Sequence, residues 1–140
     1  MIVLDTNVVS ELMKPTPART VTDWLDAQPS SDIWLTAITV AEVTYGVARL
    51  PKGRRKTAVA ATVADMIRED FAGRIHDFDV AAAHRYGEIV ARRETLGRPI
   101  SMADAEIAAI CQARNATLAT RNTEDFDGAG VTLINPWQHS

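Results

Sequence analysis

The sequence predicts an α/β fold in which a mostly parallel central sheet is flanked by helices on both faces. Short apolar runs with β-branched residues, such as Ile2–Leu4, are typical of parallel strands that are buried on both sides. These runs alternate with longer segments whose apolar residues recur at helical spacing. Strands that alternate with helices favour right-handed crossovers and parallel pairing. The length of 140 residues suits a single domain, 1–140.

The expected elements can be placed in chain order from this alternation, with proline and glycine marking many of the boundaries. We expect strands at Ile2–Leu4, Ile33–Leu35, Ile75–Phe78, Thr117–Thr120 and Val131–Ile134. We expect helices at Val8–Met13, Ala18–Ala27, Thr39–Leu50, Thr57–Phe71, Val80–Leu96 and Met102–Asn115. Polar turns are expected at Lys52–Lys56 and Arg121–Asp125, followed by a tail at Asn135–Ser140.

Composition and charge exclude several classes of protein. Apolar residues make up 46% of the chain and charged residues 24%, which is ordinary for a globular protein. No apolar run approaches the roughly 20 residues of a membrane helix, and no basic leader precedes the first strand, so we expect a cytoplasmic protein without membrane contact. The net charge of −3 gives no overall attraction to nucleic acid. Any nucleic-acid partner must therefore be held by local basic groups or metal ions.

Several acids are expected at one end of the sheet. Asp5 ends the first strand, Glu42 lies in the first turn of the helix after the second strand, and Asp104 lies in the first turn of the helix from Met102. Glu124 and Asp125 follow the strand that begins at Thr117. Converging carboxylates suit a hard cation such as Mg²⁺ or Mn²⁺, which assists attack on a phosphodiester. These acids are therefore candidate metal ligands.

When each acid is taken alone, helix capping is favoured over metal binding. Thr39–Glu42 and Ser101–Asp104 both fit the capping-box pattern, in which an acid at the third helical position bonds back to the cap. Asp5 is likewise an N-cap candidate for the first helix. Their shared placement is what favours a site, because independent caps need not all fall at the carboxyl end of one sheet.

Other chemistry finds less support in the sequence. His76, His84 and His139 lie in separate elements without orienting partners, and no zinc spacing or phosphate-cradling glycine loop is present. The single cysteine, Cys111, lies on the apolar side of its helix and is expected in the core. Among the basic residues, Arg98 and Arg121 are candidate phosphate contacts, because they precede the segments that carry Asp104 and Asn122.

Together these stretches resemble PIN-domain ribonucleases, in particular the VapC/FitB-like toxins of type II toxin–antitoxin pairs. The similarity runs in order over essentially the whole chain. The first, second and fourth of the matching pieces are specific in combination. The pieces are Ile2–Asn7 with Ser10 and Glu11, Thr39–Glu42, Met102–Asp104 with its Ala-rich helix, Thr120–Asn122 with Asp125 and Phe126, and Asn135–Trp137.

The resemblance implies a PIN-like fold and an endoribonuclease that depends on Mg²⁺ or Mn²⁺. It also implies a homodimer, inhibited by a cognate antitoxin, a small DNA-binding protein whose tail occludes the acidic pocket. The family's metal-binding and catalytic acids fall on Asp5, Glu42 and Asp104. Its supporting polar positions fall on Thr6, Asn7, Thr120, Asn122 and Asp125.

This sequence departs from the family pattern at Asn122, where an acid often follows Thr-Arg. An amide oxygen is a neutral and weaker ligand for a hard cation. An alternative function is therefore an inactive binding module that keeps the fold and captures a partner's basic tail in the acidic pocket. A haloacid-dehalogenase-like phosphatase with Asp5 as nucleophile is disfavoured, because Asn7 stands where that chemistry needs a second acid.

Overall fold

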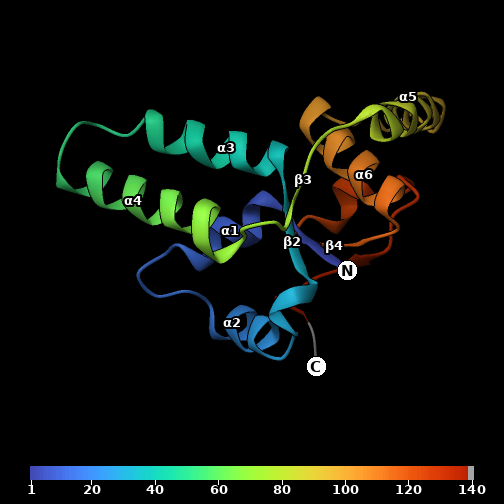
Figure 1. The fold of residues 1–140 in the computed structure, drawn as a ribbon. Helices are drawn as coiled ribbons and strands as arrows, with labels where there is room; N and C mark the ends of the chain where they lie inside the picture. Colours follow the sequence, from blue (N-terminus) through green and yellow to red (C-terminus); the bar gives the residue numbers. More distant parts are fainter. Residues whose placement is uncertain (139–140) are drawn as a thin grey trace.

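The computed structural model describes residues 1–138 (Figure 1). Its five strands form one parallel sheet in the order β3-β2-β1-β4-β5. The strands are β1 (Ile2–Leu4), β2 (Ile33–Thr36), β3 (Ile75–His76), β4 (Thr117–Ala119) and β5 (Leu133–Ile134). Every neighbouring pair in this order is parallel, which confirms the α/β class. His139 and Ser140, the end of the expected tail, lie outside the described residues.

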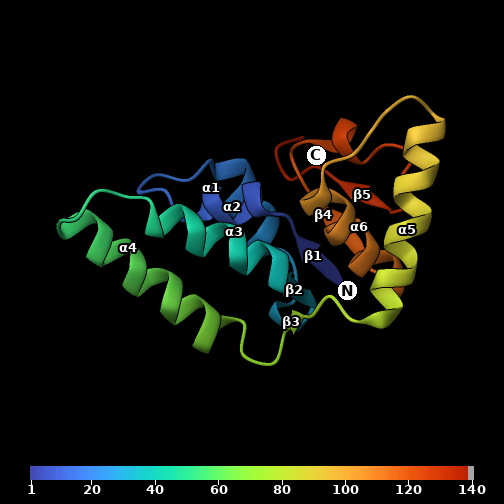
Figure 2. The same ribbon diagram turned by 90° about the horizontal axis from the view of Figure 1, so that it is seen from above.

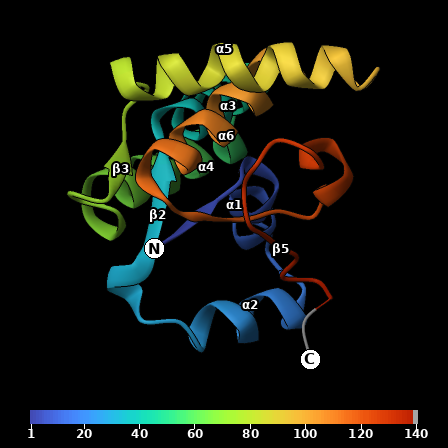
Figure 3. The ribbon, with the colours of Figure 1, turned by 90° about the vertical axis from the view of Figure 1, so that its right-hand side faces the viewer.

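Helices cover both faces of the sheet, as expected (Figure 2). They are α1 (Thr6–Leu12), α2 (Arg19–Asp26), α3 (Ala37–Ala48), α4 (Arg54–Asp65), α5 (Val80–Thr95) and α6 (Met102–Arg114). Shorter turns are the 3-10 helices η1 (Ser30–Asp32) and η3 (Thr123–Phe126) and the π-helical η2 (Met66–Asp70). In Figures 2 and 3, α5 and α6 lie side by side on one side of the sheet, and α1 and α2 lie on the other.

Alternating strand residues divide the interior into two apolar clusters. Val3 of β1 and Leu118 of β4 pack with α5 and α6. Leu4 of β1 and Leu35 of β2 point the other way and pack with α1, α2, α3 and α4. Because successive side chains of a strand point to opposite faces, a strand covered on both faces must be apolar throughout. This requirement explains the short continuous apolar runs.

The chain reverses its direction across the sheet between β1 and β4. From β1 it proceeds to β2 and β3 on one side, and after α5 and α6 it returns to β4 and β5 on the other. The backbone N–H of Asp5 donates to the carbonyl of Ala119 at 2.9 Å, so the carboxyl ends of β1 and β4 are joined. Such a switch point opens a crevice for ligands beyond the strand ends.

Three helix starts differ from the expectation by two or more residues. Helix α1 begins at Thr6 rather than Val8, directly after its N-cap Asp5. Helix α3 begins at Ala37 rather than Thr39, because Thr36 at the end of β2 is itself the N-cap, and its hydroxyl accepts from the N–H of Thr39 at 3.2 Å. Helix α4 begins at Arg54, so the second half of the expected turn Lys52–Lys56 is helical. The Lys56 ammonium donates to the carbonyl of Ala48 at 2.9 Å and ties α4 to the end of α3.

The remaining differences are small. Strands β3 and β5 are shorter than expected, and the expected turn Arg121–Asp125 contains the start of η3. The expected helix Thr57–Phe71 changes from α to π geometry at Met66. Helices α3 and α4 form the expected hairpin, which projects away from the sheet in Figure 1. Within residues 1–138, no helix combines the length and apolar character needed to cross a membrane.

Candidate active site

Asp5 occupies the switch point and is almost fully buried, with 5% of its surface exposed. As the N-cap of α1, it accepts the N–H of Thr6 on Oδ1 at 2.8 Å. Its Oδ2 accepts the Thr120 hydroxyl at 2.8 Å and the Asn7 amide at 3.3 Å. The capping role and the site role expected for Asp5 are therefore compatible.

The Thr120 hydroxyl connects the segment after β4 to Asp5 at the end of β1 through a hydrogen bond. While it donates to Asp5, it accepts the Asn7 amide at 3.2 Å and the N–H of Asn122 at 3.1 Å. Its proton and both lone pairs are thus engaged. Asn7 also accepts the N–H of Arg121 on Oδ1 at 3.2 Å. Together, Thr120 and Asn7 fix the position of the Asp5 carboxylate.

Glu42 reaches the same place from α3. Since α3 begins at Ala37, Glu42 lies in its second turn, and the expected capping-box role is wrong. Its Oε1 instead accepts the Thr6 hydroxyl at 2.6 Å, and the Thr39 hydroxyl lies 3.1 Å from that of Thr6. These contacts join Glu42 to the residue that follows Asp5.

Asp104 is half-buried in the first turn of α6, as expected. Ser101 is the N-cap, and its hydroxyl accepts the N–H of Asp104 at 3.2 Å. Burial raises the pKa of Asp104, with further contributions from the negative charges of Asp125 and Glu42. Asp104 therefore lies in the helical turn that Ser101 caps, and its carboxylate also interacts with other acids.

The three acids line one open pocket of about 440 Å³. Its walls come from the end of β1, from α1, α3 and α6, and from the segment after β4. The lining residues are Asp5, Thr6, Asn7, Ser10, Glu11, Lys14, Glu42, Asp104, Arg121, Asn122 and Trp137. The structure thus brings Asp5, Glu42, Asp104 and Asn122 together, as the sequence predicted.

The surroundings of Asp5 disfavour its negative charge. Burial raises the pKa of Asp5 from 3.8 to about 6, while the hydrogen bonds from Thr120 and Thr6 lower it. The charges of Asp104 and Glu42 act in the same direction as burial, and the pKa of about 6 is the net result of all these effects. Carboxylates that destabilise one another in this way are stabilised by a bound cation.

The carboxylate oxygens of the pocket are ligands of the type that Mg²⁺ or Mn²⁺ prefers, but their spacing limits how many can bind one ion directly. Among residues 1–138, no three side chains of Asp, Glu, His or Cys lie close enough to ligate one ion together. Mg²⁺ commonly uses one or two carboxylates and keeps several waters. The chemistry of the pocket therefore fits an ion held by one or two of these acids directly and by the rest through water. The ligand roles of Asp5, Glu42 and Asp104 stay predictions.

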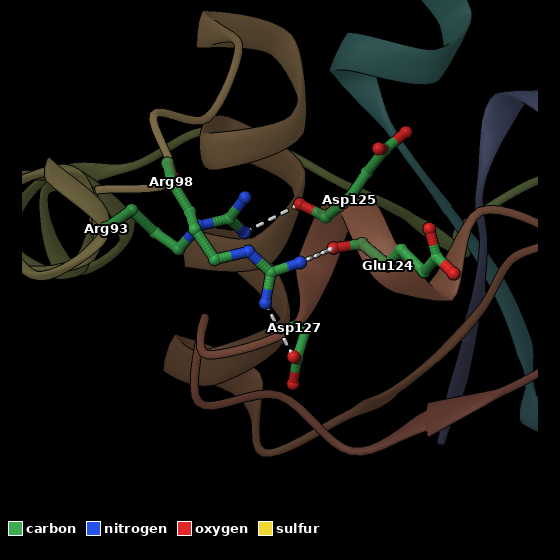
Figure 4. A network of polar contacts seen from close by, with 5 residues as sticks. All are labelled: Arg93, Arg98, Glu124, Asp125 and Asp127. Carbon is green, nitrogen blue, oxygen red and sulfur yellow. Dashed lines mark hydrogen bonds and ion pairs between the residues drawn. The ribbon is translucent and has the colours of Figure 1, made fainter. Parts of the chain in front are cut away.

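Asp125 and Glu124 lie in η3, and neither lines the pocket. Figure 4 shows how two arginines hold this turn. The buried Arg93 donates to the carbonyl of Asp125 at 2.7 Å, and Arg98 donates to the carbonyl of Glu124 at 3.2 Å and to the Asp127 carboxylate at 2.7 Å. Arg98 is therefore placed outside the pocket in a structural contact, whereas Arg121, the other expected phosphate contact, lines the pocket.

Lys14 and Trp137 are pocket residues that were not singled out as site residues from the sequence. Lys14 makes an ion pair with Glu11 at 2.9 Å. Trp137 comes from the segment after β5, and the Arg121 guanidinium carbon lies 5.0 Å from its ring centroid. The i, i+3 spacing of Glu11 and Lys14 was a usable signal for the ion pair, whereas nothing local connects Trp137 with Arg121.

Comparison with known proteins agrees with this geometry. The chain matches the PIN domain family over residues 2–130. The VapC ribonuclease Y4jK of Sinorhizobium fredii is 44% identical over 138 residues, which cover 99% of each chain. The toxin FitB of Neisseria gonorrhoeae is 43% identical over 137 residues, which cover 98% of this chain and 99% of FitB.

The solved structure of FitAB bound to an IR36 DNA fragment aligns with a TM-score of 0.94 and 42% identity, covering 100% of this chain and 98% of that chain. The chain therefore belongs to the PIN-domain family. Within that family it is similar to VapC and FitB proteins over nearly its whole length. The expected family and fold class are both confirmed.

Proposed function

We propose that this protein is a divalent-metal-dependent endoribonuclease and the toxin of a type II toxin–antitoxin pair. The observation that carries the proposal is the position of Asp5 at the β1/β4 switch point, buried and sharing one pocket with Glu42 and Asp104. The name of a close relative, a VapC ribonuclease, agrees with RNA as the substrate.

The acids of the pocket and the polar residues around Asp5 have different roles in this reaction. Thr6, Asn7 and Thr120 hold the Asp5 carboxylate in place through their donated hydrogen bonds. Asp5, Glu42 and Asp104 would hold Mg²⁺ or Mn²⁺, directly or through water. When bound, such an ion would lower the pKa of an attacking water and offset negative charge at the scissile phosphate. Asn122 supplies a neutral oxygen at the pocket wall.

Cleavage of RNA tests the proposal directly. The wild-type protein is expected to cut a structured RNA with Mn²⁺ and not with EDTA, and Asp5→Asn is expected to remain folded and lose cleavage. Asp65→Asn, which removes an exposed carboxylate of α4, is the matched control and keeps full activity. Full cleavage by Asp5→Asn would show that the carboxylate is not required.

The partner side of the proposal rests on the relatives. FitB is a toxin by name, and the related structure holds FitAB on DNA. We therefore expect a small DNA-binding antitoxin whose tail occludes the acidic pocket, a homodimer, and a cytoplasmic location. Co-expression with the product of the neighbouring reading frame, followed by light scattering, measures both the complex and the dimer. A monomer that binds no such product would contradict this side of the proposal.

Asn122 favours a second candidate, a binding module whose acidic pocket captures a basic tail. With a neutral amide at this wall, the pocket has one carboxylate fewer than the family pattern often provides. Calorimetric titration with Mn²⁺ separates the two functions. A nuclease binds Mn²⁺ and loses that binding in Asp5→Asn, whereas a binding module takes up a basic peptide and no Mn²⁺.

A further inference from the structure

Arg121 is held in place from both ends of its backbone. Its N–H donates to Asn7 at 3.2 Å, and its carbonyl accepts the Asn135 amide at 3.5 Å. The Asn135 Oδ1 in turn accepts the N–H of Trp137 at 2.9 Å, which closes a turn at Asn135–Trp137. One asparagine therefore links Arg121 to the tryptophan on which it lies.

The indole of Trp137 supports the guanidinium of Arg121. Trp137 is partly buried and packs against the apolar cluster that contains Leu4, which restricts the movement of its ring. The Arg121 Cζ lies 5.0 Å from the ring centroid, within the range of a cation–π contact. Stacking occupies the face of a guanidinium and leaves the N–H groups at its edge free to bind phosphate oxygens.

Charge distinguishes Arg121 from the other cation of the pocket. Lys14 is paired with Glu11 at 2.9 Å. The side chain of Arg121 is exposed and, across residues 1–138, makes no ion pair with a carboxylate. A guanidinium that lies over an indole at an acidic pocket and has no carboxylate partner is suited to an anion brought by a ligand.

We propose that Arg121 binds a backbone phosphate of the RNA beside the acidic pocket and that Trp137 is the positioning residue that holds its guanidinium there. This inference rests on the proposed nuclease function and assigns a part of its substrate site. In this proposal, the Asn135–Trp137 turn positions Arg121 for substrate binding, a role separate from metal binding by the acids.

The test measures RNA binding without catalysis. Fluorescence anisotropy follows a labelled single-stranded RNA of mixed sequence in EDTA over a series of KCl concentrations. The logarithm of the association constant for RNA falls linearly with the logarithm of the salt concentration. Arg121→Gln is expected to make this slope shallower by about 0.7, the value for one phosphate contact to a single strand. Trp137→Leu is expected to weaken binding about two- to fivefold with an unchanged slope, because the charge remains. Trp137→Phe is expected to restore most of the loss.

Arg49 and Tyr45 provide the matched control, since they form a similar pair at the C-terminal end of α3, outside the pocket. The Arg49 Cζ lies 5.6 Å from the Tyr45 ring centroid. Arg49→Gln and Tyr45→Leu are expected to leave both affinity and slope unchanged. An unchanged slope in Arg121→Gln, or equal binding by Trp137→Leu and wild type, overturns the proposal. Arg121 is exposed, so its variant tests the phosphate contact even if Trp137→Leu does not fold.

The two proposals fail in different ways. A wild-type protein that binds RNA in EDTA but cuts nothing with Mn²⁺ contradicts the nuclease function. Cleavage with Mn²⁺ together with an unchanged salt slope in Arg121→Gln contradicts only the phosphate contact.

Discussion

At the scale of single residues, burial and metal binding favour different protonation states of Asp5. A metal ligand must be ionised, yet burial raises its pKa to about 6. The hydrogen bonds from Thr6, Asn7 and Thr120 partly offset this cost by donating to both carboxylate oxygens. The metal-free protein is therefore expected to be less stable when Asp5 is charged.

Stability of the metal-free protein should fall as pH rises through the titration of Asp5. The folded state holds the Asp5 proton more tightly than the unfolded state, because the pKa rises from 3.8 to about 6 on folding. The contribution of Asp5 to the free energy of unfolding is therefore fully present below about pH 4 and is lost between pH 4 and pH 6. The shift corresponds to about 3 kcal/mol in the free energy of unfolding, and relaxation of the folded state reduces this value.

Urea unfolding of wild type and Asp5→Asn from pH 4 to pH 7.5 measures this effect. The variant should gain stability relative to wild type as pH rises, and Mn²⁺ should reduce the difference by stabilising the charged form. A difference that is independent of pH would contradict the raised pKa.

The hydroxyl of Thr120 should matter through the charge of Asp5. Thr120→Val preserves shape but removes the donor to a buried carboxylate, and we expect a loss of about 1–3 kcal/mol at pH 7.5. The loss should be smaller at pH 4, where Asp5 is protonated. Thr117→Val, at the start of the strand that precedes Thr120, is the control, since the Thr117 hydroxyl makes no hydrogen bond within residues 1–138. Equal losses in the two variants would assign the effect to the strand rather than to the hydroxyl.

At the scale of elements, the site depends on segments that carry no pocket residue. Arg93 of α5 is buried, and its guanidinium donates to the carbonyls of Arg98 and Asp125 at 2.6 Å and 2.7 Å (Figure 4). It thus joins the α5–α6 connection to η3. The charge of Asp125 in η3 raises the pKa of Asp104, so this turn contributes to the field in the pocket.

Removing the buried guanidinium should loosen η3 more than the rest of the fold. Arg93→Met keeps much of the apolar stem but leaves two carbonyls without donors, at an expected cost of about 2–4 kcal/mol. Hydrogen exchange should speed up at Thr123–Asp127 while the amides of α6 keep their protection. Arg92→Met, a change at the exposed neighbour, is the control and should alter neither quantity. Uniform acceleration across the chain would show that Arg93 has no local role.

At the scale of the whole molecule, alternation of apolar runs and helical segments was enough to predict the sheet, the two helical layers and the convergence of Asp5, Glu42 and Asp104. These follow from local patterns, because parallel strands place their carboxyl ends at one edge. The order of the strands and the β1/β4 switch were not predictable in this way, since they depend on pairing between distant segments.

The same limit explains the misplaced details of the site. Thr36 serves as both strand end and helix cap, so the local capping pattern pointed to Thr39 instead. The position of Arg98 before Asp104 favoured a phosphate contact, but Arg98 pairs with Asp127, 29 positions away. Trp137 meets Arg121 only because β5 returns beside β4. Contacts across the sheet, rather than propensities within a segment, decide these assignments.

Anomalous diffraction from crystals soaked in Mn²⁺ would locate the ion that the proposed nuclease function requires. We expect a manganese peak in the acidic pocket, within about 2 Å of an Asp5 carboxylate oxygen, with Glu42 and Asp104 bound directly or through water. Soaked crystals of Asp5→Asn should lose the peak. A pocket without manganese at saturating Mn²⁺, or an ion bound elsewhere that leaves Asp5 without contact, would show that Asp5 is not a metal ligand.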